Sequence, residues 1–198
     1  FLALTMLSPG GIESEIMRKE DMYERSLMHF ACYGGNMNII RELVQSNYDL
    51  DSKDIEGCTP SCYAAMSGNI DVIRYLWTKG ASILINDFSN TPKPFDVACL
   101  YGNLSIVKFI YETVCSTGDL EETKKNRMLL FRNSYFANTP FHLACVGGNG
   151  EILRYLLSLE EATVENVNQF NHKMKTPLMV SCQNGSLNCV KALIGSSK

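Results

Sequence analysis

The stretch Thr139-Pro-Phe-His-Leu-Ala144 has the composition of a helix start. Threonine can accept hydrogen bonds from the unpaired amides of a first helical turn, and proline fits that turn because it has no amide hydrogen to leave unpaired. Thr59-Pro60 and Thr176-Pro177 place the same two residue types at two other points of the chain. We therefore predict that a helix begins at each of these three positions.

A second pattern lies just beyond these starts and recurs along the chain. It consists of a small residue, a Cys or Ala, two variable residues, a glycine and a polar residue, as in Ala144-Cys-Val-Gly-Gly-Asn149. The glycines of its five copies are spaced by 33, 34, 46 and 37 residues. A step of about 33 residues with insertions indicates a repeat protein. The five glycines are Gly35, Gly68, Gly102, Gly148 and Gly185.

Apolar pairs follow each glycine at helical spacing. In the first copy they are Ile39-Ile40 and Leu43-Val44, and in the second copy they are Val72-Ile73 and Leu76-Trp77. Residues at i, i+1, i+4 and i+5 form one stripe along a helix, and this stripe must be buried. A single unit of helix, glycine turn and helix is too small to bury the stripe alone, so we expect the units to stack.

The Thr-Pro-Phe-His-Leu-Ala stretch, the glycine that ends the first helix and the step of about 33 residues together resemble the ankyrin repeat. The resemblance implies an all-α solenoid of stacked helix-turn-helix units joined by hairpin loops. It covers the chain from Asp21 onward, and we expect the segment before it, residues 1–20, to supply a capping helix. The predicted repeats are 21–53, 54–86, 87–133, 134–170 and 171–198.

Three repeats depart from the residues that are usual in the family. Cys62, Asp96 and Met179 occupy the position at which the family prefers histidine, although the register is kept. The third repeat also carries an insertion over residues 112–131, in which Asp119 is predicted to cap an extra helix. We interpret this charged segment as a solvated surface excursion, with a partner site as the alternative.

The composition excludes several classes of function. The 198 residues are 45% hydrophobic and 20% charged, as in globular proteins. With a formal net charge of −3, the chain has no electrostatic attraction for nucleic acid or an anionic membrane. Its apolar start, Phe1 to Leu7, is too short to span a bilayer and lacks the basic region of a signal peptide. We expect neither nucleic-acid binding nor membrane insertion.

Catalytic signatures are absent from the sequence. It contains no Gly-x-x-x-x-Gly-Lys-Ser/Thr phosphate loop, no Gly-x-Ser-x-Gly nucleophile elbow and no His-Glu-x-x-His zinc motif. His29 and His142 occupy the ankyrin histidine position, to which the resemblance assigns structural hydrogen bonds at the helix start. We expect no enzyme activity, no cofactor and no catalytic residue.

The cysteines are predicted to be reduced. Stacked helices lie about 8 to 10 Å apart, beyond the Cα separation of about 7 Å that a disulfide tolerates. Buried thiols in this number indicate a reducing, intracellular location in the cytoplasm or nucleus. Cys58 and Cys62 lack the second pair of ligands that a zinc site needs, so no metal is expected. Four of the eight cysteines share one repeat position: Cys32, Cys99, Cys145 and Cys182.

Two functions fit these observations. The first is a protein-interaction module, because the resemblance implies a concave surface that binds a partner protein and the residues offer no reacting groups. The second is a regulatory or targeting domain of a larger enzyme or channel whose active part lies outside this stretch, since the array has no polar cap after its last helix. In either case we expect a monomer.

In ankyrin proteins the partner-contacting positions flank the hairpin tip and precede the glycine that ends the first helix. Six of the fifteen such residues here are Tyr or Phe, against 10% aromatic residues in the chain, and aromatic side chains are enriched in interfaces. We expect the fifteen to form a contiguous, partly apolar concave strip. The hairpin set is Met22, Tyr23, Arg25, Ile55, Glu56, Phe88, Tyr135, Phe136, His172 and Lys173. The helix set is Tyr33, Met66, Leu100, Tyr101 and Val146.

Overall fold

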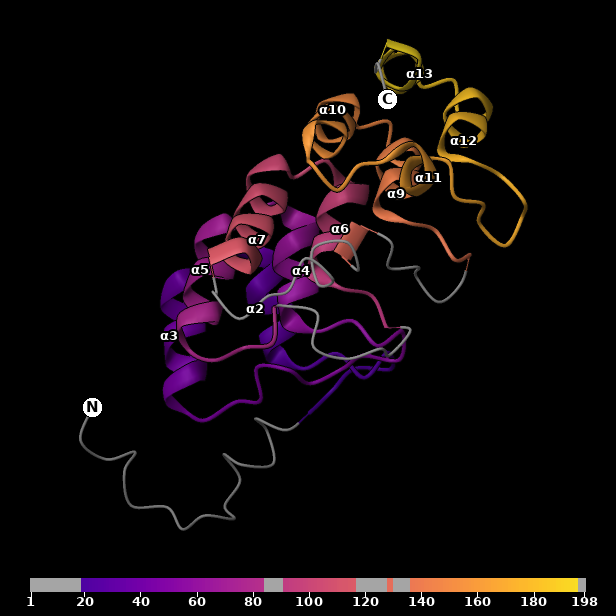
Figure 1. The fold of residues 1–198 in the computed structure, drawn as a ribbon. Helices are drawn as coiled ribbons and strands as arrows, with labels where there is room; N and C mark the ends of the chain where they lie inside the picture. Colours follow the sequence, from indigo (N-terminus) through magenta and orange to yellow (C-terminus); the bar gives the residue numbers. More distant parts are fainter. Residues whose placement is uncertain (1–18, 84–90, 117–127, 130–135, 196–198) are drawn as a thin grey trace, which may run out of the picture.

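The computed structural model describes residues 19–83, 91–116, 128–129 and 136–195 (Figure 1). Within these residues the chain is all-helical and contains no strand, so the predicted fold class is confirmed. One helix pair falls in each predicted repeat, while the repeat boundaries stay a prediction. The pairs are α2 (Leu27–Gly34) with α3 (Met37–Gln45), α4 (Pro60–Ser67) with α5 (Ile70–Thr78), α6 (Pro94–Tyr101) with α7 (Leu104–Ser116), α9 (Pro140–Val146) with α10 (Gly150–Ser158), and α12 (Pro177–Gln183) with α13 (Leu187–Gly195); the short α11 (Val164–Val167) precedes the last pair.

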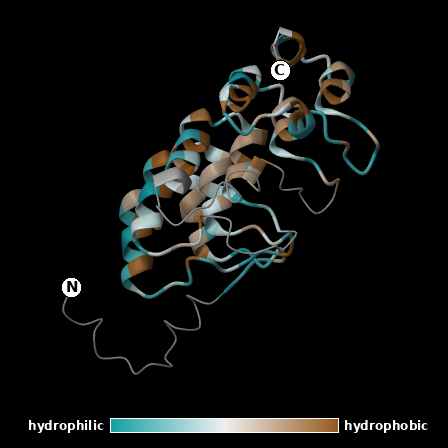
Figure 2. Cartoon of the chain, in the orientation of Figure 1, coloured by the Kyte–Doolittle hydropathy of each residue, from teal (hydrophilic) through white to brown (hydrophobic). Residues whose placement is uncertain are grey.

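The first helices of the pairs form an inner row, and the second helices form an outer row beside it (Figure 1). Along the inner row, α2 packs on α4, α4 on α6, α6 on α9, and α9 on α12. In the outer row, α5 packs on α7, α7 on α10, and α10 on α13. Figure 2 shows bands of both hydrophobic and hydrophilic residues on the outer helices, while the central inner helices are mostly hydrophobic. The apolar stripes of repeats two to four are largely buried between stacked repeats, as their spacing predicts, whereas Ile39 and Ile194 in the first and last repeats are exposed.

The three predicted helix starts are confirmed. Thr59, Thr139 and Thr176 immediately precede α4, α9 and α12, and proline is the first residue of each helix. The Thr176 hydroxyl accepts a hydrogen bond from the Met179 amide at 3.4 Å. At the other end, α4 closes on Gly68 in the left-handed conformation, with φ at 80°, which glycine adopts without steric cost.

Buried histidines tie a helix start to the following repeat. The Nδ1 atom of His29 accepts a hydrogen bond from the Ser26 amide at 3.0 Å, and its Nε2 atom donates to the carbonyl oxygen of Cys58 at 3.1 Å. His142 makes the same two contacts, the second with the carbonyl oxygen of Lys175 at 2.9 Å. Both imidazoles are buried and fully engaged. The structural role predicted for the two histidines is confirmed.

Asp96 breaks this pattern in the third repeat. It lies at the histidine position, is 3% exposed, and neither of its carboxylate oxygens has a hydrogen-bond partner among the described residues. Burial, and after it the neighbouring Cys62 thiol, raises the pKa of Asp96 to about 8, while Lys93 acts in the opposite direction. A buried carboxyl without a partner avoids the cost of a charge by keeping its proton. Asp96 is therefore mainly protonated at neutral pH.

Asparagines at the start of the outer helices tie repeats two, three and four to the repeat before each of them. The Asn103 side-chain amide donates to the carbonyl oxygens of Ala65 at 2.6 Å and Met66 at 3.2 Å. Asn149 makes the equivalent pair of bonds to the end of α6. These carbonyl groups end a helix and need a partner outside it. The approach is close, because a Cβ atom at Gly68 would lie 2.7 Å from Asn103 Oδ1.

We predict that Gly68→Ala lowers the free energy of unfolding by roughly 1 to 3 kcal/mol, because it places a side chain at a left-handed φ and against Asn103. Gly34→Ala is the matched control, since no atom lies within 4 Å of its Cβ position. The control is expected to be neutral or to stabilise by up to about 1 kcal/mol, through the unfolded state. Urea unfolding compares the two variants, and equal stabilities would contradict the prediction.

The described cysteines follow the prediction with one exception. All seven are free thiols, and Cys32, Cys99 and Cys145 are buried as predicted. Cys182 is exposed, so the prediction of a buried thiol was wrong there. The repeats of Cys32, Cys99 and Cys145 are each followed by another helix pair in the stack, whereas α12 belongs to the last helix pair in the described part of the chain.

We predict that a maleimide reagent labels Cys182 first among the seven described cysteines of the native chain. Burial raises the pKa of Cys32 to about 12, and the reactive species is the exposed thiolate. All eight cysteines should react after denaturation without a reductant. Mass spectrometry counts the labels. Fewer than eight labels in fresh denatured protein, or fast native labelling of Cys32, would count against the prediction.

Two predicted features fall mainly outside the described residues. The capping helix expected over residues 1–20 overlaps only two described residues, 19 and 20, which are not helical. The insertion helix capped by Asp119 falls largely in residues 117–127, which are also outside. Beside that segment, α7 continues to Ser116, and Met128 and Leu129 are helical and buried.

Candidate protein-binding face

The hairpin turns are built by side chains that bind their own backbone. Asp54 Oδ1 accepts hydrogen bonds from the amides of Glu56 at 2.9 Å and Cys58 at 2.8 Å. Asp21 and Asn171 play the same part in the first and fifth repeats. Turns of this kind fix the backbone through one short polar side chain. The side chains between the turn's ends are therefore presented outward.

Neighbouring turns are also bonded to each other. The amide of Ile55 donates to the carbonyl oxygen of Tyr23 at 3.0 Å, and the amide of His172 donates to the carbonyl oxygen of Phe136 at 2.8 Å. Turns one and two thus form one platform, and turns four and five form another. Both platforms project from the stack on the side of the inner helices (Figure 1).

The structure exposes most of the turn residues that the register singles out. Met22 is 83% exposed, which is extreme for a large apolar side chain. Arg25 is only partly exposed, and Phe88 and Tyr135 lie outside the described residues. Seven of the ten predicted turn residues are exposed: Met22, Tyr23, Ile55, Glu56, Phe136, His172 and Lys173.

The helix set lies at the ends of the inner helices, beside the turns. Tyr33 on α2 is 57% exposed, and Tyr101 at the end of α6 is 55% exposed. Val146 is exposed on α9, while Met66 and Leu100 are half-buried. Aromatic side chains bury large areas on binding and so contribute strongly to interfaces. The two tyrosines are therefore the main apolar groups that this row offers to a partner.

Arg25 organises an aromatic cluster at the first turn. Its guanidinium lies 4.9 Å from the ring centroid of Tyr23 and 4.8 Å from that of Phe30. Its Nε atom donates to Asp21 Oδ2 at 2.7 Å, and this hydrogen-bonded pair lowers the pKa of Asp21 to about 2. Arginine held between two rings and a carboxylate fixes the orientation of both rings. The cluster is thus a preformed surface.

Tyr63 joins this cluster to the second turn. Its hydroxyl donates to Asp54 Oδ2 at 2.8 Å, and its ring meets the Tyr33 ring edge to face at 6.5 Å. It also contacts the buried His29 ring at 5.1 Å. Burial, and after it the hydrogen bond to the Asp54 carboxylate, raises the pKa of Tyr63. A single side chain therefore couples turn two to α2 and α4.

The fifth turn carries the corresponding contacts at the other end of the stack. The Lys173 ammonium lies 4.5 Å from the Phe136 ring centroid. Lys175 donates a hydrogen bond to the side-chain oxygen of Gln183, which ends α12. Here basic side chains lie against the turns, whereas acidic side chains dominate turns one and two.

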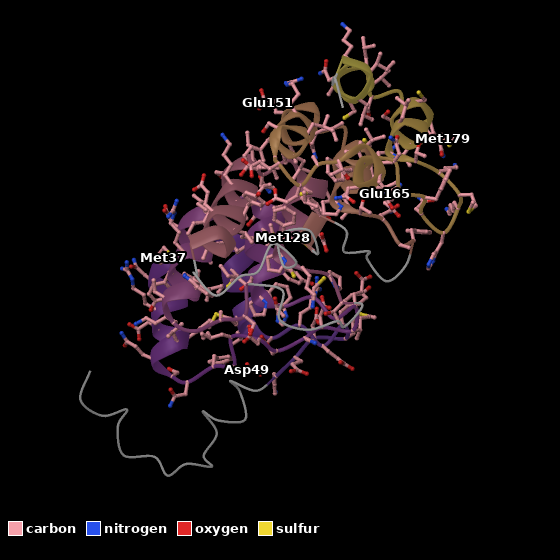
Figure 3. The ribbon with its side chains drawn as sticks, in the orientation of Figure 1. Met37, Asp49, Met128, Glu151, Glu165 and Met179 are labelled. Carbon is pink, nitrogen blue, oxygen red and sulfur yellow. The ribbon has the colours of Figure 1, made fainter. Side chains whose placement is uncertain are left out.

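Three exposed apolar residues on this side are absent from the predicted set. They are Phe30 at 46%, Met174 at 68% and Met179 at 52% exposure, and Met179 projects from α12 in Figure 3. Phe30 shares its register with Leu143, which is buried. The repeat register therefore predicts which side of the helix such a residue lies on. Whether the residue is exposed depends on whether another repeat packs against that side.

The face has the chemistry of a binding surface. It combines exposed aromatic and apolar side chains with a few fixed charges.

No helix in the described ranges is long and apolar enough to cross a bilayer. The same residues hold no group of three His, Cys, Asp or Glu side chains placed to bind a metal ion.

Comparisons with known proteins agree with this architecture. A phosphate system positive regulatory protein of Saccharomyces cerevisiae is 25% identical over 91% of this chain and 17% of its own length. Human transient receptor potential cation channel subfamily A member 1 is 21% identical over 90% of the chain and 18% of the channel. A tyrosine-protein kinase of Hydra vulgaris is 26% identical over 66% of the chain and 16% of the kinase. The chain thus spans less than a fifth of each of these relatives.

A family model described as ankyrin repeats (3 copies) matches residues 4–87, 27–120 and 95–198. Together the three ranges cover nearly the whole chain. They contain all five helix pairs and the buried histidines that link successive repeats. The chain belongs to the ankyrin repeat family.

Proposed function

We propose that this chain is a protein-interaction module that binds a partner protein through the face formed by its hairpin turns and the ends of its inner helices. The observation that carries the proposal is the exposure of Tyr33 and Tyr101 on two inner helices of one stack. Exposed apolar patches on a protein surface commonly mark interaction sites. Ankyrin repeats are protein-interaction modules in general, and this face supplies the anchoring side chains.

We propose as a second candidate that the chain is the regulatory or targeting part of a larger protein. Its relatives include a regulatory protein, a kinase and a channel, and it spans less than a fifth of each. In this case, too, the chain itself acts by binding and not by catalysis. The full-length open reading frame discriminates between the two candidates, because a catalytic or channel domain in the same frame supports only the second.

We further propose that the chain acts as a monomer in the cytoplasm or nucleus, without a cofactor and without binding nucleic acid. The net charge of −3 supports the last point, because a phosphate backbone attracts surfaces with a marked excess of Lys and Arg. Sedimentation equilibrium with and without duplex DNA tests the monomeric state and the lack of DNA binding. A mass of about twice 22.1 kDa, or comigration with DNA, would refute them.

The binding proposal predicts that Tyr33→Ala and Tyr101→Ala each weaken the affinity for a partner by roughly 1 to 2 kcal/mol or more, because each removes an exposed aromatic anchor. Partners are captured from a lysate of the native cells with the wild-type chain, then purified and titrated by calorimetry. Val164→Ala is the matched control, because Val164 is an exposed apolar residue on α11, outside the face. Unchanged affinity in both tyrosine variants would refute the proposal.

A further inference from the structure

We infer that the occupant of this face is a linear protein segment with an uncharged middle, a basic end over repeats one and two, and an acidic end over repeat five. The inference rests on the proposed function and adds the chemistry of the partner. It follows from the distribution of charge along the face, which the aromatic residues alone do not reveal.

The row of inner-helix ends carries no charge along the stack. The two residues before each turn glycine line the ends of the inner helices, and all ten of them are uncharged. A charged partner side chain placed against this row would lose water without gaining a counter-ion, which is costly. The row therefore selects apolar or neutral polar residues. It consists of Tyr33-Gly34, Met66-Ser67, Leu100-Tyr101, Val146-Gly147 and Gln183-Asn184.

The end at repeats one and two is acidic. Glu24 and Glu56 are exposed at adjacent turns, and neither forms an ion pair within the described residues. The Arg25 charge is balanced by Asp21, and its guanidinium is flanked by aromatic rings. The carboxylate of Asp54 is buried and bonded to its own turn. Exposed Lys53 precedes turn two, but the net charge of turns one and two is still negative with Lys53 counted, so the two exposed glutamates attract Lys or Arg.

The end at repeat five is basic. His172, Lys173 and Lys175 follow one another around the fifth turn. Lys173 lies over the Phe136 ring, and Lys175 is bonded to a neutral glutamine, so neither ammonium has a counter-ion among the described residues. The described residues of turn four, 136–138, are uncharged. Repeat five therefore offers a positive charge to Asp or Glu of the partner.

The acidic and basic ends of the face are far enough apart to bind different parts of the partner. Four steps of about 8 to 10 Å between stacked helices place turns one and five roughly 32 to 40 Å apart. This exceeds the screening length of about 8 Å at physiological salt, so each end interacts with its own part of the partner. An extended segment rises about 3.3 Å per residue and spans the distance with roughly 10 to 12 residues.

The test uses a displayed library of random peptides about 16 residues long, selected on the full chain. Clones that bind wild-type protein and lose binding to the Tyr33→Ala/Tyr101→Ala variant define peptides of this face. We expect these peptides to carry Lys or Arg near one end, Asp or Glu near the other, and uncharged residues between. One such peptide is then synthesised and its affinity measured by fluorescence polarisation.

Charge reversal checks the assignment of each end. Glu24→Lys/Glu56→Lys should weaken the peptide by about tenfold or more at low salt, and replacing the basic residues of the peptide by Glu should restore its affinity. The matched control is Glu151→Lys/Glu165→Lys, which makes the same charge change at two exposed glutamates on α10 and α11 (Figure 3). Lys173→Glu should likewise weaken the peptide, and replacing the acidic residues of the peptide by Lys should restore its affinity.

The outcomes separate this inference from the proposed function. Peptides that require the two tyrosines but show no charge polarity, or that respond equally to both charge-reversal pairs, overturn the inference and leave the binding face in place. A selection that yields no peptide dependent on the tyrosines overturns both. Peptides with opposite polarity, acidic toward repeats one and two, also overturn the inference.

Discussion

Asp96→Asn is expected to stabilise the protein above neutral pH and to remove most of the pH dependence of its stability between about pH 4 and pH 8. Asp96 is buried in α6, and its carboxylate oxygens have no hydrogen-bond partner in the part of the chain that the structure describes. The Cys62 thiol of α4 and the Cys99 thiol of α6 lie near it, and Lys93 supplies an opposing charge. The variant keeps the shape of the side chain but cannot ionise.

The sign of the effect follows from the raised pKa of Asp96. Burial moves this pKa from its ordinary value of 3.8 to about 8, so the folded state holds a proton that the unfolded state releases in between. The contribution of the neutral carboxyl is fully present below about pH 4 and is lost as the pH rises through about 8. Each unit of difference between the folded and unfolded pKa is worth about 1.4 kcal/mol, which gives a loss of up to about 6 kcal/mol.

Urea unfolding at a series of pH values measures the effect. The difference in unfolding free energy between variant and wild type should grow with pH and level off above about pH 8. Asp71→Asn is the matched control, because Asp71 is exposed in the first turn of α5. Parallel curves for wild type and Asp96→Asn would show that the Asp96 carboxyl does not titrate with a raised pKa.

Phe141→Ala is expected to lower the free energy of unfolding by roughly 3 to 5 kcal/mol, because Phe141 is fully buried in α9 and the change leaves a cavity. In a stack each repeat contacts only its neighbours, so the loss should act mainly on repeat four and on repeats three and five beside it. Amide hydrogen exchange should quicken in α6, α9, α10 and α12 and stay near the wild-type rate in α2 and α3.

Phe170→Ala supplies the control for this prediction. The same side chain is removed, but Phe170 is 46% exposed and lies outside the helices. We expect it to change stability by less than about 1 kcal/mol. Uniformly faster exchange across all five helix pairs in Phe141→Ala would mean that the array unfolds as one unit, which contradicts the nearest-neighbour description.

The sequence predicts the fold well because the fold is periodic. Thr139, His142 and the turn glycine Gly148 each act on backbone close to them in sequence, at a helix start or in a turn. Residues with the same roles recur about every 33 residues. Helix starts, turn conformations and the roles of His29 and His142 therefore follow from residue type and register. The class of the protein follows from the same signals.

What sequence reasoning missed depends on contacts between repeats. Phe30 and Cys182 are exposed because no described repeat lies against their side of the stack, although residues at the same register positions elsewhere are buried. The Arg25 cluster and the bond from Tyr63 to Asp54 each join a turn to the inner helix of the same repeat, and the ring contacts of Tyr63 with Tyr33 and His29 cross from one repeat to the next. Register fixes the direction of a side chain but not the partner it meets, so these contacts needed the three-dimensional structure.

Backbone amide chemical-shift mapping of the full chain, with and without a peptide selected on it, tests the central claim most directly. If the partner binds the face of turns and inner-helix ends, the largest shifts should fall in turns one, two and five, and at Tyr33 and Tyr101. The outer helices α3, α5 and α10 should change little. Largest shifts in those outer helices, with turns and tyrosines unchanged, would contradict the account.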